Sequence, residues 1–102
     1  NKLHRNIELL RSCLENSKLS PAFIPSESAI HCCVISGNDQ VKIVAKVLQQ
    51  KGFDVRPILS PTVPQGKERL RICLHSFNSE EDIERLVTEL QHFINSDQLD
   101  ND

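Results

Sequence analysis

Residues 60–75 read SPTVPQGKERLRICLH, and this stretch decides the fold of the chain. Its two prolines restrict the backbone and remove hydrogen-bond donors, which predicts a stiff loop projecting from a sheet. Beyond the loop, apolar and polar residues alternate, which predicts a strand that buries Leu70 and Ile72. Arg69 and Arg71 lie two residues apart, so both should point to the opposite face of that strand.

The rest of the chain supplies the other elements of a small domain. Apolar residues at helical spacing predict a helix at each end, a buried run predicts the first strand, and Gly52 is a plausible helix stop. Ser79 and Asp82 have the spacing of a capping box. The expected elements are a helix to about Asn16, a strand over 29–35, a helix from Asn38 or Asp39 to Gly52, a strand from Phe53 to about Ile58, the strand of residues 69–74 and a helix beginning at Asn78 or Ser79.

These elements predict an α+β fold. If the first two strands run parallel through a right-handed crossover, the third lies between them and antiparallel to both. We therefore expect a two-layer sandwich, with a three-stranded, mainly antiparallel sheet and helices on one face. Residues 1–19 should form a linker helix, 20–95 the α+β domain, and 96–102 a flexible acidic tail.

Length and composition narrow the class of protein. A chain of 102 residues suits one domain, and the absence of Met suggests a fragment or a processed product. The net charge of −2, with Lys and Arg scattered among acids, argues against nucleic-acid binding. No apolar run approaches the roughly 20 residues needed to cross a bilayer, so we expect a cytoplasmic protein.

The four cysteines could form disulfides or bind a metal ion. Cys32 and Cys33 are adjacent on an expected strand and face opposite ways, and the other two occupy apolar periodic positions, so we expect free thiols. His31, Cys33 and His75 could approach one another as metal ligands. No Cys-x-x-Cys or His-x-x-x-His spacing pre-sets such a site, so we expect no metal.

The pattern PTVPxGxxRLRI at residues 61–72, followed by SEEDIERL at 79–86, resembles the C-terminal part of the pyridoxal-phosphate-dependent α-oxoamine synthases. The similarity runs from about Ile30 to Leu90. It implies the small C-terminal domain of fold-type I pyridoxal-phosphate (PLP) enzymes. A large preceding domain binds the cofactor in this family, so the resemblance implies no catalytic and no cofactor-binding residue in this chain.

The resemblance also implies roles for two residues. Arg71 matches the arginine that binds the α-carboxylate of the amino-acid substrate. A guanidinium group suits this task because it is planar, always charged and able to donate two parallel hydrogen bonds. Without the resemblance, a strand arginine is more often exposed or salt-bridged. Thr62 could line the acyl-chain channel, or its hydroxyl could form a hydrogen bond with the backbone of its own turn. The family pattern gives Arg69 no equally clear role. A surface salt bridge with Glu68 or Glu84 is as plausible for it as any functional role.

The chain departs from the family pattern just before the two-proline loop. A typical arginine is replaced by Leu59, and Arg56, three residues upstream, would replace it only from a different angle.

The mixed-charge cluster Lys67-Glu68-Arg69 is typical of a solvated turn. Finally, no lysine has the sequence context of the one that bonds to the cofactor; those considered are Lys2, Lys18, Lys42, Lys51 and Lys67.

By this resemblance, the chain is part of an acyltransferase that condenses a pimeloyl thioester with L-alanine in biotin synthesis. The family works as homodimers, and the chain alone should be inactive without the large domain. Members that use glycine or serine are the nearest alternatives. A different alternative is a separate regulatory module in which Arg71 holds a small anionic effector.

Overall fold

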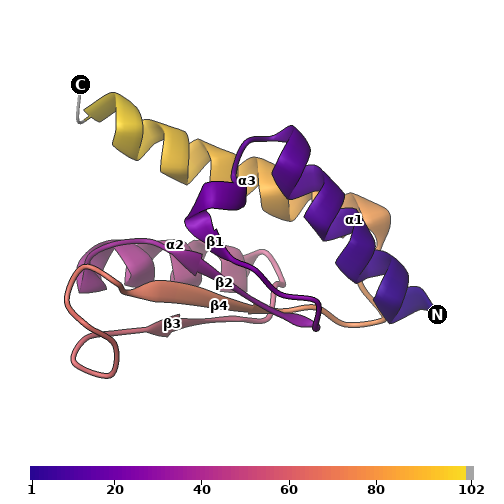
Figure 1. Cartoon of the computed structure of the whole chain (residues 1–102), viewed down its shortest axis with the longest axis horizontal. Helices are drawn as coiled ribbons and strands as arrows, with labels where there is room; N and C mark the ends of the chain where they lie inside the picture. The colour runs from indigo at the N-terminus through magenta and orange to yellow at the C-terminus, as the bar shows by residue number, and fades with distance from the viewer. Residues whose placement is uncertain (101–102) are drawn as a thin grey trace.

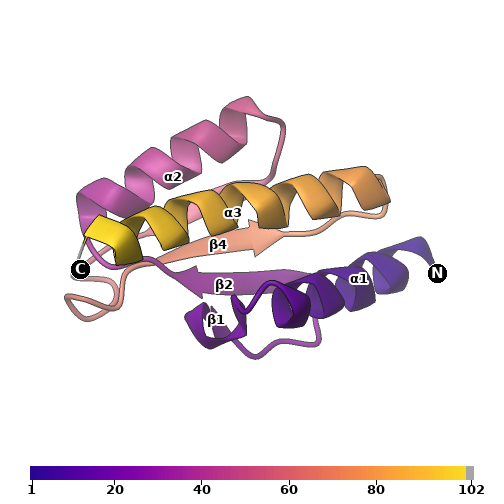
Figure 2. The ribbon, with the colours of Figure 1, turned by 90° about the horizontal axis from the view of Figure 1, so that it is seen from above.

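The structure is a computed structural model that describes the backbone of residues 1–100 and the side chains of residues 1–94. Figures 1 and 2 show two layers, with the helices lying over one face of a sheet. None of the helices in the described part has the length and apolar content needed to cross a membrane. The elements are α1 (Lys2–Asn16), the 3₁₀ turn η1 (Ser20–Ala22), β1 (Phe23–Ile24), β2 (Ile30–Val34), α2 (Asn38–Gln50), β3 (Val55–Ile58), β4 (Arg69–Cys73) and α3 (Glu80–Asp100).

The sheet has the order β1-β2-β4-β3, and every neighbouring pair is antiparallel. β4 therefore lies between β2 and β3, as the sequence predicted for its third strand. The expected α+β two-layer architecture is confirmed. The sheet differs from the prediction in one strand, because β1 adds to the outer side of β2. This strand has only two residues between Pro21 and Pro25, too few for an alternating pattern to reveal it.

The core lies between the sheet and the helices. Leu70 and Ile72 of β4 are 0% and 1% exposed, as the alternation predicted. Cys33 is buried on the same side, whereas its neighbour Cys32 faces the other way and is half-buried. All four cysteines are free thiols.

α1 packs beside α3 on top of the sheet (Figure 1). Its apolar residues Ile7, Leu10 and Leu14 join the same core cluster as the strand residues. The helix therefore contributes to the core of this domain. The proposed boundary between a linker helix of residues 1–19 and a domain of residues 20–95 stays a prediction.

α3 begins with the predicted capping box. The backbone N–H of Ser79 donates to Asp82 Oδ2 at 3.0 Å, and the N–H of Asp82 donates to Ser79 Oγ at 3.1 Å. The helical backbone continues to Asp100, beyond the expected start of the acidic tail. Residues 101–102 and the side chains after Ile94 lie outside the described residues, so the flexible tail stays a prediction.

Candidate functional site

The sheet face opposite the helices carries both arginines and apolar side chains, and we call it the open face. Burial alternates along each strand, which assigns every second residue to this side. No helix of residues 1–100 covers it (Figure 1). Its members are Ile30, Cys32 and Val34 of β2, Arg56 and Ile58 of β3, and Arg69, Arg71 and Cys73 of β4.

Arg71 lies in the middle of the open face and is exposed. The register places it directly opposite Arg56 on β3 and Cys32 on β2. Directly opposed residues have Cβ atoms about 4.5–5.5 Å apart, so the two arginine side chains leave the sheet side by side. Together they can donate several hydrogen bonds to one carboxylate or phosphate.

Sequence reasoning missed this pair because it did not know the register between β3 and β4. Arg56 was considered only as a replacement for the family arginine at Leu59, yet it shares the face of Arg71. Leu59 packs against the core on the helix side.

Arg69 lies on the open face, as predicted, but it does not form the suggested salt bridges. Its Nε donates to the carbonyl oxygen of Lys67 at 3.2 Å. Among residues 1–94, no ion pair joins Arg69 to Glu68 or Glu84. Its contact is therefore local, which leaves Arg71 and Arg56 as the candidate anion-binding residues.

Glu68 is the residue that sequence reasoning assigned wrongly. It is 2% exposed, and not part of a solvated turn. One oxygen, Oε1, accepts hydrogen bonds from the backbone N–H groups of Gly37 and Gly66, both at 2.9 Å. These bonds, with that from Gly37 the largest cause, hold the pKa of the Glu68 carboxyl below its usual value. We call Glu68, Gly37 and Gly66 the loop anchor.

Further hydrogen bonds join the two-proline loop to the start of α2. The backbone N–H of Ser60 donates to Asn38 Oδ1 at 3.0 Å, and Ser36 Oγ donates to the carbonyl oxygen of Gly66 at 2.9 Å. Gly66 has φ of 89°, the left-handed conformation that its type suggested. Thr62 is exposed in this loop. Its role in an acyl-chain channel stays a prediction.

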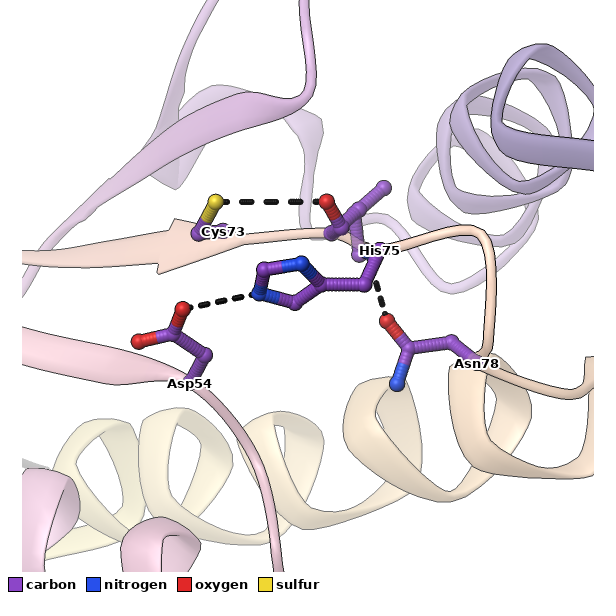
Figure 3. Close-up of polar contacts among 5 residues, drawn as sticks. Asp54, Cys73, His75 and Asn78 are labelled. Atoms are coloured by element: carbon purple, nitrogen blue, oxygen red, sulfur yellow. Dashed lines mark hydrogen bonds and ion pairs between the residues drawn. The ribbon is translucent and has the colours of Figure 1, made fainter.

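A second polar cluster lies where β4 ends (Figure 3). His75 Nε2 lies 2.8 Å from Asp54 Oδ2, and the sulfur of Cys73 is close to both. The metal-ligand trio considered from the sequence is not formed. His31 and Cys33 are buried on the helix side, whereas His75 turns to the other side of the strand with Asp54 and Cys73.

A cavity of about 470 Å³ lies between the end of α1 and β1. Its lining includes Arg11, Glu15 and His31. His31 is 2% exposed, and its Nε2 has no hydrogen-bond partner among the described residues. Burial lowers the pKa of His31, which favours the neutral ring inside the fold.

A pyridoxal-phosphate site needs a lysine that bonds covalently to the cofactor inside a shielded pocket. Every lysine of this chain has an exposed side chain; they are Lys2, Lys18, Lys42, Lys46, Lys51 and Lys67.

No family model matches the chain, but relatives of known function do. The 8-amino-7-oxononanoate synthase of Pectobacterium atrosepticum is 39% identical over 90 residues, which cover 88% of this chain and 23% of that protein. The chain belongs to the 8-amino-7-oxononanoate synthase family. It corresponds to a C-terminal region of these synthases, as the resemblance to the α-oxoamine synthases implied.

Two further synthases of this family match with different coverage. That of Photorhabdus laumondii is 36% identical over 92 residues, covering 90% of this chain and 24% of that protein. That of Emericella nidulans is 48% identical over 46 residues, covering 45% of this chain and 11% of that protein. The chain thus spans about a quarter or less of the length of the curated relatives it matches.

Solved structures of such enzymes contain a region with a similar fold. The 8-amino-7-oxononanoate synthase of Francisella tularensis aligns with a TM-score of 0.76 at 18% identity, covering 95% of this chain and 28% of that one. Serine palmitoyltransferase from S. paucimobilis aligns with a TM-score of 0.71 at 18% identity, covering 93% of this chain and 24% of that one. At such identities the likeness concerns the fold alone, which is that of a domain of a PLP enzyme of fold type I.

Proposed function

We propose that this chain is the C-terminal domain of an enzyme that condenses a pimeloyl thioester with L-alanine to 8-amino-7-oxononanoate in biotin synthesis, with loss of carbon dioxide. The observation that carries the proposal is the 39% identity to such a synthase over nearly the whole chain. Pyridoxal phosphate would act in this chemistry as the electron sink for the carbanion. Because all lysines here are exposed, the cofactor would be held by another part of the enzyme, and the chain alone would be inactive.

The contribution of this chain would be to bind and orient the substrate. Arg71 would grip the α-carboxylate of the amino acid through paired, charge-assisted hydrogen bonds. Arg56, directly opposite on β3, would add a second guanidinium to the same anion. Holding the reacting group in one orientation can lower a barrier by several kcal/mol.

The two-proline loop would form one wall of the acyl-chain channel, with Thr62 lining it. The loop anchor supports this role, because Glu68 accepts one 2.9 Å hydrogen bond from Gly66 of the loop and another from Gly37, which precedes α2. A wall that positions a flexible acyl chain must itself keep one conformation, and these bonds provide that rigidity.

The open face would be the surface that meets the rest of the enzyme. It carries exposed Ile30, 45% accessible, beside half-buried apolar residues and the arginines. We place the complete enzyme in the cytoplasm as a homodimer, with a small amino acid and an acyl thioester as its substrates. These assignments rest on the family.

The test is Arg71→Ala in the complete enzyme. A charge-assisted hydrogen bond is worth about 1.5–3 kcal/mol, so kcat/KM for alanine should fall about ten- to a hundredfold. Arg69→Ala is the matched control, because it removes an arginine from the same strand and face. Equal kcat/KM for Arg71→Ala and wild type would refute the assignment.

Substrate competition then identifies the member of the family. Turnover with glycine or serine in preference to alanine would favour another α-oxoamine synthase, a class that includes the serine palmitoyltransferases with similar fold. The exposed Arg56 and Arg71 pair also suits an effector site in a separate regulatory module. Saturable binding of alanine or pimelate to the 102-residue chain alone would favour that alternative.

A further inference from the structure

We propose that Asp54, Cys73 and His75 form a binding site for one divalent transition-metal ion of the zinc class. The ligand atoms of these three residues all lie within 4.8 Å of one another. Imidazole nitrogen, thiolate sulfur and carboxylate oxygen are the three donor types that zinc uses in proteins. This function is separate from the substrate binding proposed for Arg71.

β3, β4 and the residues next to them place these three side chains on one side of the sheet. Cys73 and His75 are two residues apart, so they project to the same side of the chain at the end of β4. Asp54 lies across from them just before β3, and its carbonyl oxygen accepts a 2.9 Å hydrogen bond from the backbone N–H of Cys73. The spacing between the donors is thus set by neighbouring, hydrogen-bonded segments.

Two contacts hold the imidazole of His75 in place, and a third holds its backbone. Its Nε2 contacts Asp54 Oδ2 at 2.8 Å, and its ring stacks on Phe77 with centroids 4.7 Å apart and an interplanar angle of 8°. Its backbone N–H donates to Asn78 Oδ1 at 2.8 Å (Figure 3). A ring oriented in this way loses little freedom when it binds an ion.

Only a small adjustment would bring the three donors to a common ion. With metal bonds of about 2.0–2.3 Å, donor atoms in a tetrahedral site lie about 3.3–3.8 Å apart. The 2.8 Å contact between His75 and Asp54 would open slightly, and Cys73 would move inward. The Asp54 side chain, 47% exposed, is free to make that change by rotation.

In this chain alone the site is also accessible. The His75 side chain is 35% exposed and Cys73 is half-buried, so an ion can reach the donors from solvent. Three protein ligands leave a fourth position for water or a small molecule. The thiol proton is released on binding, because the thiolate is the form of cysteine that binds metal.

The experiment is titration of the reduced chain with Zn²⁺ in competition with a chromophoric chelator, repeated with Co²⁺. We expect one ion per chain, and a sulfur-to-cobalt charge-transfer band with the intensity of one thiolate. Cys73→Ser should abolish that band and weaken zinc binding at least tenfold. Asp54→Asn and His75→Gln should also weaken binding, because each removes a strong donor.

Cys32→Ser is the matched control, since Cys32 is a half-buried cysteine on the same open face, opposite Arg71. It should keep the cobalt band and the zinc affinity of the wild type. Circular dichroism of each metal-free variant separates loss of the site from loss of the fold. If a folded Asp54→Asn or His75→Gln variant bound zinc as the wild type does, or if the wild type gave no thiolate-to-cobalt band, the proposal would be overturned.

Discussion

Arg56 and Arg71 lie directly opposite each other on neighbouring antiparallel strands, and both are exposed on the open face. Like charges in this position repel each other and destabilise a sheet. An anion bound between them would turn the repulsion into two attractions. The pair therefore favours the anion-binding role proposed for this face, in which a substrate carboxylate occupies that position.

Replacing Arg56 with glutamate should stabilise the free chain. Arg56→Glu converts the repulsive pair into an attractive one, worth about 0.2–1 kcal/mol relative to a neutral pair, and high salt should reduce the gain. Urea unfolding at low and high salt measures both effects. Arg69→Glu is the control because its opposite neighbours, Val34 and Ile58, carry no charge. Equal gains for the two variants would show that the pairing is not responsible.

The loop anchor should make stability depend on acid. Backbone hydrogen bonds, chiefly that from Gly37, lower the pKa of Glu68 in the folded chain from its ordinary value of 4.5. The unfolded chain therefore takes up this proton first, and the stabilisation is complete above about pH 4.5 and lost as the pH falls through the lower folded value.

Glu68→Gln tests this dependence. The variant should be less stable than the wild type at neutral pH and should lose less stability as the solution is acidified. Urea unfolding over a pH series measures both. Glu81→Gln, an exposed glutamate of α3, is the control and should keep the acid dependence of the wild type. A Glu68→Gln curve parallel to the wild-type curve would contradict the anchor.

His31 should add a pH dependence near neutrality. Burial, and to a lesser extent the charge of Arg11, lowers the pKa of His31 in the folded chain below 6.5. As the pH falls below 6.5, the unfolded chain binds a proton that the folded chain resists, so stability decreases until the folded ring also titrates. His31→Gln should flatten this part of the unfolding profile, whereas His92→Gln, exposed on α3, should leave it unchanged.

Asn6 should be important for docking α1. It is 3% exposed, and its Nδ2 donates to the carbonyl oxygens of His75 and Asn78, both at 2.9 Å. Asn6→Ala removes both bonds and leaves the Asn78 carbonyl oxygen without a partner, whereas the His75 oxygen still accepts from the Asn78 N–H; it should cost about 1–3 kcal/mol of unfolding free energy. Asn16→Ala, exposed at the end of the same helix, should change stability by less than about 0.5 kcal/mol. Similar losses in both variants would show that the buried hydrogen bonds of Asn6 are not responsible.

The sequence predicted those features that depend on local pattern. Alternation placed Leu70 inward and Arg71 outward, and the spacing of Ser79 and Asp82 predicted a capping box that the structure contains. Such features depend on residues two or three positions apart, and their physical signals lie in the chain itself.

Features that depend on register or on distant segments were not predicted. The opposition of Arg56 and Arg71 requires the alignment of β3 with β4, and the pairing of His75 with Asp54 joins segments 21 residues apart. Glu68 was expected in solvent because its neighbours are charged. Its burial depends on Gly37, which arrives from another loop.

The outer strands β1 and β3 determine how this sheet can meet other chains. β1 is two residues long, and β3 contains Pro57, which has no backbone N–H to offer an incoming strand. Neither side of the sheet therefore provides a continuous row of donors for strand addition, the route by which exposed sheets recruit further copies and grow into fibres. The edges therefore disfavour strand addition and leave the faces of this domain as the surfaces for association.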